Sequence, residues 1–324
     1  MGYSFDLLAG SRYQLRVLVV FRHPKLILFQ LFVLLEVNGE VNDVRFTDVA
    51  GAMPDLTVLQ YSLVDNIFSM TVATMGAAAL FFFLGRSAVG AAYRPALMVS
   101  GIVVAIACYH YFMIRDSWQE AFVLTENGYT GSGAAFNDFY RYADWILTVP
   151  LLLVELVIVM RLARAKAAPM LTKLVIAAAA MIALGYPGEV ISSPDGQMMR
   201  LVWGGLSCIP FIYILYVLWV ELTKSLETQP PAVRSLVNLA RYVILITWMV
   251  YPIAYGLGST TAALEAASGG SEGAGGIVGL QIGYAVADMA AKAGFGVLIY
   301  FIAMAKTRED AANGISPDAL AMPV

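Results

Sequence analysis

An apolar run from residue 277 to 305 constrains the fold most, because it contains Asp288 and Lys292. A helix that crosses a bilayer needs about 20 predominantly apolar residues, so this run can place both ionisable groups inside the hydrocarbon. The two residues are four positions apart and therefore lie on one face of a helix. A charged lysine in lipid costs about 3 kcal/mol or more, and the carboxylate reduces that cost without removing it.

A lysine buried in this way has two interpretations. Burial favours the neutral, nucleophilic amine, which forms an imine with a carbonyl compound, and a nearby carboxylate then balances the charge of the protonated imine. The alternative is a structural ion pair that fixes the packing of the helix. The rest of the chain separates these two interpretations.

The composition indicates a polytopic membrane protein. Of the 324 residues, 60% are hydrophobic and 13% are charged, whereas soluble domains carry about 25% charged residues. The net charge of -3 gives no indication of nucleic-acid binding. Two cysteines and two histidines are too few to suggest a disulfide framework or a histidine metal cluster, so we expect no metal site.

Seven long apolar segments predict the fold. In lipid, only helices satisfy the backbone groups of segments this long and hydrophobic. We therefore expect an all-α membrane protein with a seven-transmembrane-helix bundle in residues 56–308 and a tail at 309–324. The predicted helices cover 57–84, 95–114, 139–160, 168–186, 198–220, 235–257 and 277–305.

Residues 1–55 precede the bundle and differ from it. Basic residues come before a short apolar run at 26–35, which a polar stretch follows. A run of this length after basic residues resembles a targeting or signal segment more than a spanning helix. The alternative is an amphipathic helix that lies on the membrane surface.

The distribution of charge predicts the orientation of the bundle. The connections 85–94, 161–173 and 221–241 and the end of the last helix contain lysines and arginines, whereas the alternate connections are mainly acidic. Basic loops lie preferentially in the cytoplasm. We therefore expect the N-terminus of the bundle outside and the C-terminus in the cytoplasm.

The third predicted helix contains a row of polar groups. Arg141, Asp144 and Thr148 follow one another at spacings of three and four residues. Glu155 comes eleven residues after Asp144, which returns it to nearly the same face about 16 Å deeper along the helix. One face of this helix therefore carries a basic group, an acid, a hydroxyl and a second acid.

Depth along the bundle links these groups to the buried lysine. Counted at about 1.5 Å per residue from the basic connections, His110, Asp144 and Asp288 fall at about 24 to 27 Å. Lys292 falls at about 21 Å and Glu155 at about 9 Å, so the order predicts a proton path with the lysine in the middle. Singly, each group has a simpler interpretation as a helix ion pair, a core histidine or a carboxylate that reaches the interface.

Aromatic residues supply a candidate ligand pocket. The sixth predicted helix carries aromatic side chains at spacings of three and four around a proline that bends the helix. By itself such a face is more often core packing. Together with side chains of the third and fifth helices, it can wall a flat, elongated, conjugated ligand. The candidate pocket residues are Trp145, Leu152, Trp203, Trp248, Tyr251, Pro252 and Tyr255.

The sequence resembles the microbial rhodopsins, and among them the proton-pumping xanthorhodopsin and proteorhodopsin group. The resemblance covers about 55–308 and rests on RYADWILTVPLLLVEL at 141–156, WMVYPIAY at 248–255, DMAAK at 288–292 and YHYF at 109–112. It implies a seven-helix fold that holds all-trans retinal as a protonated Schiff base on Lys292.

The same resemblance implies roles for the polar groups. It identifies Asp144 as primary counterion and proton acceptor, Asp288 as second counterion and Glu155 as cytoplasmic proton donor. His110, Arg141 and Thr148 are then modulators of the counterion. The equal depths of His110 and Asp144, together with the YHYF stretch, predict a hydrogen bond between these two residues.

The chain also departs from the best-known haloarchaeal pump of the family. That pump has aspartate in place of Glu155, threonine in place of Val149 and tryptophan in place of Tyr255. We find no convincing pair of external glutamates that would match its proton-release group.

Gly204 is relevant to whether the protein binds a second chromophore. Many relatives have a bulky aromatic at this position, whereas xanthorhodopsin-like pumps that bind a carotenoid antenna share the glycine. The resemblance therefore implies an opening toward lipid that admits a carotenoid. The alternative is close helix packing, because Gly204 and Gly205 let two backbones approach each other.

The expected function is that of a light-driven outward proton pump, not an enzyme. The main alternative is a sensory rhodopsin that signals through a partner, and a retinal-free transporter with the same acids is the third. The expected partners are protons, the lipid bilayer and further copies of the chain. The expected location is the cell membrane or an internal membrane.

Overall fold

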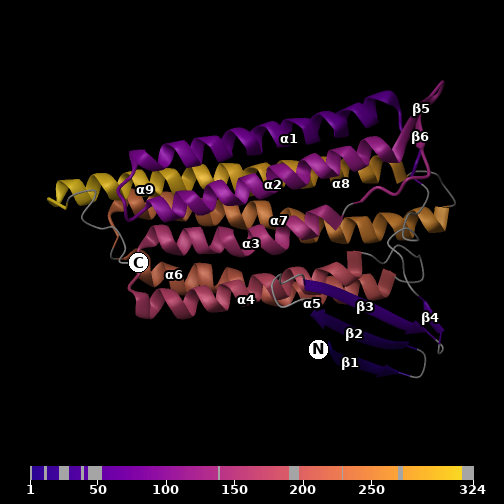
Figure 1. The fold of residues 1–324 in the computed structure, drawn as a ribbon, viewed down its shortest axis with the longest axis horizontal. Coiled ribbons are helices and arrows are strands. Elements are labelled where there is room, and N and C mark those ends of the chain that lie inside the picture. The colour runs from indigo at the N-terminus through magenta and orange to yellow at the C-terminus, as the bar shows by residue number, and fades with distance from the viewer. Residues whose placement is uncertain are drawn as a thin grey trace. The chain divides into compact units, whose positions relative to one another are not determined.

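The computed structural model describes residues 2–10, 13–21, 29–37, 40–42, 53–137, 139–189, 197–227, 229–268 and 273–315. The chain divides into two units, Met1–Gly51 and Ala52–Val324, and each is described by itself. In the second unit, long helices run side by side (Figure 1).

Seven helical spans in the described part of the second unit are long and apolar enough to cross a membrane, which confirms the predicted bundle. The first four are α1 (Val58–Gly85), α2 (Arg94–Ala121), α3 (Phe139–Met160) and α4 (Arg164–Glu189). The fifth joins α5 (Gln197–Tyr216), η3 (Val217–Glu221) and α6 (Leu222–Leu226), and the sixth lies in α7 (Pro231–Ser268). The seventh joins α8 (Gly273–Asp288), η4 (Met289–Gly294) and α9 (Phe295–Ala312).

Local signals explain where these helices begin and how they bend. Thr57 and Gln60 form a capping box before α1, which satisfies two backbone donors that a helix start leaves free. Pro150 and Pro252 lie inside α3 and α7. The segments η3 and η4 are π-helical, a conformation that often marks functional sites.

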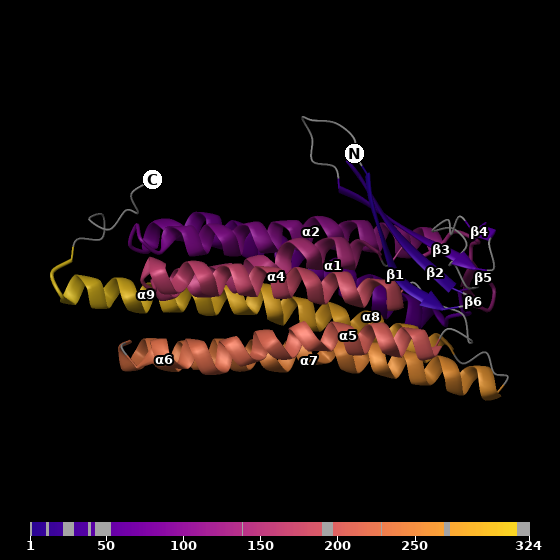
Figure 2. The same ribbon diagram turned by 90° about the horizontal axis from the view of Figure 1, so that it is seen from below.

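One end of the bundle carries most of the basic connections. The end of α1, the start of α2 and the ends of α3 and α9 meet there, at the left of Figure 1. We call it the basic end, because Arg86, Arg94, Arg161 and Lys306 lie at these helix termini. Figure 2 shows α5 and α7 running side by side along the same axis.

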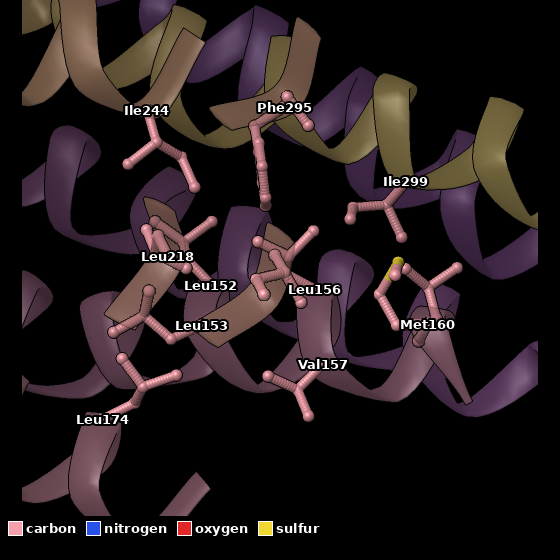
Figure 3. Close-up of a cluster of buried hydrophobic side chains, with 14 of the residues drawn as sticks. Leu152, Leu153, Leu156, Val157, Met160, Leu174, Leu218, Ile244, Phe295 and Ile299 are labelled. Atoms are coloured by element: carbon pink, nitrogen blue, oxygen red, sulfur yellow. The ribbon is translucent and has the colours of Figure 1, made fainter. Parts of the chain in front are cut away.

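Apolar side chains fill the bundle between η4 and the basic end. Figure 3 shows Phe295 and Ile299 of α9 pointing toward Leu152, Leu156 and Met160 of α3. All five side chains are buried. Since Phe295 and Ile299 follow Lys292 by three and seven residues, this layer separates the lysine from the basic end.

A two-stranded hairpin, which the sequence analysis did not predict, closes the opposite end. Strands β5 (Phe122–Thr125) and β6 (Gly128–Gly131) connect α2 to α3. Leu56 and Tyr129 exchange two backbone hydrogen bonds of 2.8 Å, and the ring of Tyr61 stacks on Tyr129 with centroids 3.6 Å apart. Gly128 has φ 128°, and a side chain there would collide with the carbonyl oxygen of Leu56.

The first unit contains four antiparallel strands in sequential order. They are β1 (Gly2–Gly10), β2 (Tyr13–Phe21), β3 (Phe29–Val37) and β4 (Glu40–Asn42). The described part of the 26–35 run is therefore strand, not the surface helix that was one alternative. A targeting or membrane-surface role for residues 1–55 stays a prediction.

Candidate functional site

Lys292 lies at the centre of the site, in the π-helical segment η4. Its Nζ donates to Asp144 Oδ2 on α3 and lies 3.1 Å from Asp288 Oδ1 on α8. The lysine is 2% exposed and each acid 1% exposed. The structure thus brings together one cation and two carboxylates from three elements, all out of contact with solvent.

Asp288 is surrounded by donors from other helices. Its Oδ2 accepts from the Tyr111 hydroxyl at 2.7 Å. Its Oδ1 accepts from the Tyr251 hydroxyl at 2.5 Å and from Trp145 Nε1 at 3.3 Å. Sequence reasoning missed Tyr111, although it follows His110 in the YHYF stretch. Only the three-dimensional structure shows that its hydroxyl reaches Asp288.

Asp144 has fewer partners than Asp288. Thr148 Oγ1 donates to the Asp144 backbone oxygen at 2.9 Å and lies 3.4 Å from Oδ2. Oδ1 has no hydrogen-bond partner in the described part of the chain. His110 Nδ1 lies 3.7 Å from this oxygen, which is too far for a hydrogen bond.

The predicted hydrogen bond between His110 and Asp144 is therefore not formed. His110 Nδ1 instead lies 3.1 Å from the backbone oxygen of Ile106, one turn earlier in α2. Equal depth in the bundle does place the imidazole beside the carboxylate. It does not determine which acceptor the ring nitrogen faces.

Arg141 lies one turn from Asp144, at the side of the site away from the basic end. Its Nη2 donates to Gln281 Oε1 on α8 at 2.5 Å. The guanidinium carbon lies 5.2 to 5.8 Å from the ring centroids of Phe68, Tyr111 and Tyr284, a distance at which cations and aromatic faces attract each other. The sequence analysis did not predict Gln281 as the residue that holds Arg141.

Glu155 lies on α3 toward the basic end, where it has fewer hydrogen-bond donors around it than Asp288. It is fully buried, and its Oε2 accepts from the Ser100 hydroxyl of α2 at 2.5 Å. Its Oε1 has no hydrogen-bond partner among the described residues. Ser100, a small polar residue in an otherwise apolar helix, was not singled out from the sequence.

A cavity of about 270 Å³ opens beside Lys292. Trp145, Leu152, Trp248, Tyr251, Pro252 and Tyr255 line it as predicted, whereas Trp203 is absent from the lining. A Cβ atom on Gly188 of α4 would lie 3.0 Å from the Cβ of Trp203, so the base of this side chain lies against α4. The wall also includes residues that the sequence analysis did not name: Tyr142, Met181, Ser207, Cys208, Phe211 and Tyr284.

Gly204 lies in the cavity wall against Tyr255. A Cβ atom on Gly204 would lie 2.6 Å from the Tyr255 ring, whereas one on Gly205 would meet nothing within 4 Å. The Tyr255 hydroxyl donates to the backbone oxygen of Arg200 at 2.7 Å, and the Arg200 guanidinium lies 4.5 Å from the ring centroid. Gly204 thus lets this ring approach the backbone of α5.

Comparison with known proteins gives one family. The model of bacteriorhodopsin-like proteins matches residues 62–306. The green-light absorbing proteorhodopsin of a gamma-proteobacterium is 32% identical over 251 residues, which are 77% of this chain and 89% of that protein. Bacteriorhodopsin of Halobacterium salinarum is 34% identical over 172 residues, 52% of this chain and 58% of that protein.

Solved structures agree with this result. Thermophilic rhodopsin is 46% identical with a TM-score of 0.74, and the match covers 80% of this chain and 99% of that chain. Xanthorhodopsin, described as a light-driven ion pump with dual chromophore, is 48% identical with a TM-score of 0.74. That match covers 82% of this chain and all of the other.

Proposed function

Because the chain belongs to the bacteriorhodopsin-like protein family, we propose that it is a light-driven outward proton pump that carries all-trans retinal covalently on Lys292. One observation supports this most strongly. Lys292 Nζ is buried between Asp144 and Asp288 at the end of an aromatic cavity. The likeness to xanthorhodopsin supports light-driven transport.

The residues around the cavity fit retinal. Trp145 and Trp248 offer flat apolar surfaces to a conjugated chain, and the two carboxylates balance one positive charge at the lysine nitrogen. Retinal attached to Lys292 would supply absorption of visible light and a photoisomerisation that changes the basicity and surroundings of Nζ. The protein's own residues supply the proton positions.

Asp144 fits the role of proton acceptor better than Asp288. Three donors hold Asp288, and hydrogen bonds of this kind stabilise the charged carboxylate. Asp144 Oδ1 has no hydrogen-bond partner in the described chain, so it has room for a proton. Asp144 therefore takes the proton from Lys292 Nζ, while Asp288 keeps its charge and its place.

Glu155 fits the role of proton donor. A fully buried carboxylate with a single hydroxyl donor is costly, so the neutral acid is the form that suits these surroundings. Glu155 lies about 16 Å from Asp144 along α3. It can therefore return a proton toward Lys292 Nζ only from the opposite side to the acceptor.

The direction follows from the basic end. If this end faces the cytoplasm, as basic loops usually do, Glu155 lies on the cytoplasmic side of Lys292 and Asp144 on the outer side. Protons then move from Glu155 to Lys292 and from Lys292 to Asp144. This order gives net transport outward.

Light-induced pH change in cell suspensions tests the proposal. Cells that express the chain with retinal should acidify the medium in light, and a protonophore should abolish the acidification. A visible pigment that gives no pH change would favour the sensory alternative. Alkalisation in light would contradict the outward direction.

A carotenoid as second chromophore is a finer part of the proposal. Xanthorhodopsin is described as having a dual chromophore, and Gly204 lies in the cavity wall here. In this chain the ring of Tyr255 covers Gly204, so a carotenoid would rest against that ring. Purified pigment with a hydroxylated carotenoid should show carotenoid bands in the excitation spectrum of retinal fluorescence. If Gly204→Trp and the parent behave alike, Gly204 is not part of a carotenoid site.

A further inference from the structure

Five side chains meet at the basic end, beyond Glu155. Lys306 of α9 donates to the backbone oxygen of Met160 at 3.1 Å and to Gln229 Oε1 at 2.6 Å. Tyr93, just before α2, donates its hydroxyl to Asp310 Oδ2 at 2.6 Å. Arg161 Nη1 lies 4.0 Å from the same oxygen. We call Tyr93, Arg161, Gln229, Lys306 and Asp310 the basic-end cluster.

The cluster joins four parts of the fold that lie far apart in sequence. Met160 is the last residue of α3, and the final carbonyl groups of a helix lack intrahelical partners. Lys306 supplies such a partner and also holds Gln229, which lies just before α7. Tyr93 connects the start of α2 to the end of α9. A single network therefore holds α2, α3, α9 and the segment that leads into α7.

Arg161 adds a backbone feature to this network. Its φ is 51°, a left-handed conformation that is uncommon for residues other than glycine. This turn ends α3 and brings the guanidinium to 5.7 Å from the centroid of the Tyr93 ring. Lys306 Nζ lies 5.9 Å from the same centroid. Two cations thus lie within 6 Å of this ring centroid, a distance at which cations and aromatic faces attract each other.

Burial changes across the cluster from the inside outward. Tyr93 is 1% exposed and Lys306 is 8% exposed, whereas the side chains of Asp310 and Arg161 are 22% and 35% exposed. Burial and the hydrogen bond to Asp310 raise the pKa of Tyr93 to about 12, so its hydroxyl remains a donor at neutral pH. The cluster therefore has a wet outer face and a dry inner face.

Glu155 lies beneath the dry face. It precedes Met160 by five residues on α3, about 8 Å along the axis, and its partner Ser100 follows Tyr93 by seven residues, about 10 Å. Ala96, Leu97, Leu156 and Ile302 are among the buried apolar residues in this interval. Both the cluster and these apolar side chains therefore lie between Glu155 and the solution at this end.

We propose that the basic-end cluster is a lock that sets how fast Glu155 takes up a proton from the solution at that end. The contact of Lys306 with Gln229 is the part that opens, because within the described residues it is the only hydrogen bond that joins the rest of the cluster to the segment before α7. Asp310 is the partly exposed acid of the cluster that receives the proton first. This inference rests on the proposed function of Glu155 as the donor.

The experiment compares Lys306→Met with Gln229→Ala, which remove the same contact from either side. In the full-length, retinal-bound protein, a pH-indicator dye reports proton uptake after a flash. Both variants should take up protons about threefold to tenfold faster than the parent, the factor expected for one hydrogen bond. The double variant should be no faster than the faster single variant, since both changes break one contact.

Arg308→Gln is the matched control, because Arg308 is an exposed cation two residues from Lys306 on α9. It should leave the uptake rate unchanged. If Lys306→Met and Arg308→Gln behave alike, the lock is refuted.

Hydrogen exchange in the dark gives a readout independent of transport. The backbone amides of residues 158–163 and 229–234 should exchange faster in both Lys306→Met and Gln229→Ala than in the parent. If exchange is faster but the rate of proton uptake is unchanged, the cluster only holds the helices together, and the proposal is overturned. A parent that takes up no proton after a flash would instead refute the proposed function, whatever exchange shows.

Discussion

The surroundings of Lys292 and of Glu155 differ in how many donors serve each acid. Asp288 accepts from two tyrosine hydroxyls and an indole, and the Lys292 amine lies within ion-pair distance. Glu155 accepts from one serine and is otherwise enclosed by apolar side chains. Both acids are out of solvent, so burial alone does not distinguish their roles.

The number of donors does distinguish them. A carboxylate with several donors is held as an anion and in one position, whereas a carboxyl group with one donor gains most by keeping its proton. Asp144 is intermediate, because it pairs with Lys292 through one oxygen and leaves the other without a partner in the described chain. These differences fit the roles proposed for Glu155 as proton donor and for Asp144 as proton acceptor.

The largest effect should come from removing Lys292, the cation that Asp144 and Asp288 share. Lys292→Ala should give a colourless protein that does not pump, because no amine remains to hold retinal and Asp144 loses its partner. Absorbance spectra after reconstitution with retinal measure this outcome. Adding retinylidene amine to the variant should restore colour, which shows that the cavity still forms. A visible pigment without that addition would contradict the assignment of Lys292.

The next largest effect should come from Asp144, whose Oδ1 has no hydrogen-bond partner in the described chain. Asp144→Asn should abolish light-induced acidification and shift the absorption maximum, since the proposed acceptor of the proton from Lys292 is lost. Asp65→Asn is a suitable control, because Asp65 pairs with Arg115 on α2 and not with Lys292. The control should still pump. Undiminished pumping by Asp144→Asn would give the acceptor role to another group.

Much of this site could be predicted from the sequence, because it depends on spacing along single helices. The separation of Asp288 from Lys292 and of Asp144 from Glu155, together with the length of the apolar runs, is enough to place them by depth. These distances follow from the rise of a helix and are insensitive to packing.

What the sequence did not predict depends on helix rotation and on contacts between distant segments. Successive residues of a helix differ in direction by about 100°. Depth therefore does not show that Tyr111 faces Asp288, or that Trp203 faces α4 while Gly204 faces the cavity. The π-helical turn at Lys292 and the contact of Lys306 with Gln229 likewise have no local signal.

A smaller effect should come from changing Glu155. Pumping should continue, but at a lower rate. Glu155→Gln should slow proton uptake about a hundredfold at neutral pH, the usual contribution of a positioned proton donor. Ser100→Ala should slow it only severalfold, because one hydrogen bond to Glu155 is lost while the acid remains. Flash photolysis with a pH-indicator dye measures both rates. An unchanged rate in Glu155→Gln would favour the sensory function, which needs no fast donor.

The smallest effect should come from His110, which lies beside Asp144 without a hydrogen bond to it. The imidazole is near enough, at 3.7 Å, for the charges of the two groups to influence each other. His110→Ala should therefore shift the absorption maximum of the pigment, because the charges around Lys292 change. The shift should be smaller than that of Asp144→Asn, because the direct contacts of Asp144 are to Lys292 and Thr148. Tyr109→Phe is the control, since Tyr109 is an exposed neighbour on α2 and its loss of a hydroxyl should leave the absorption maximum unchanged. Equal absorption maxima in His110→Ala and the parent would show that the histidine does not influence the charge of Asp144, and the acid would then depend on its direct contacts with Lys292 and Thr148.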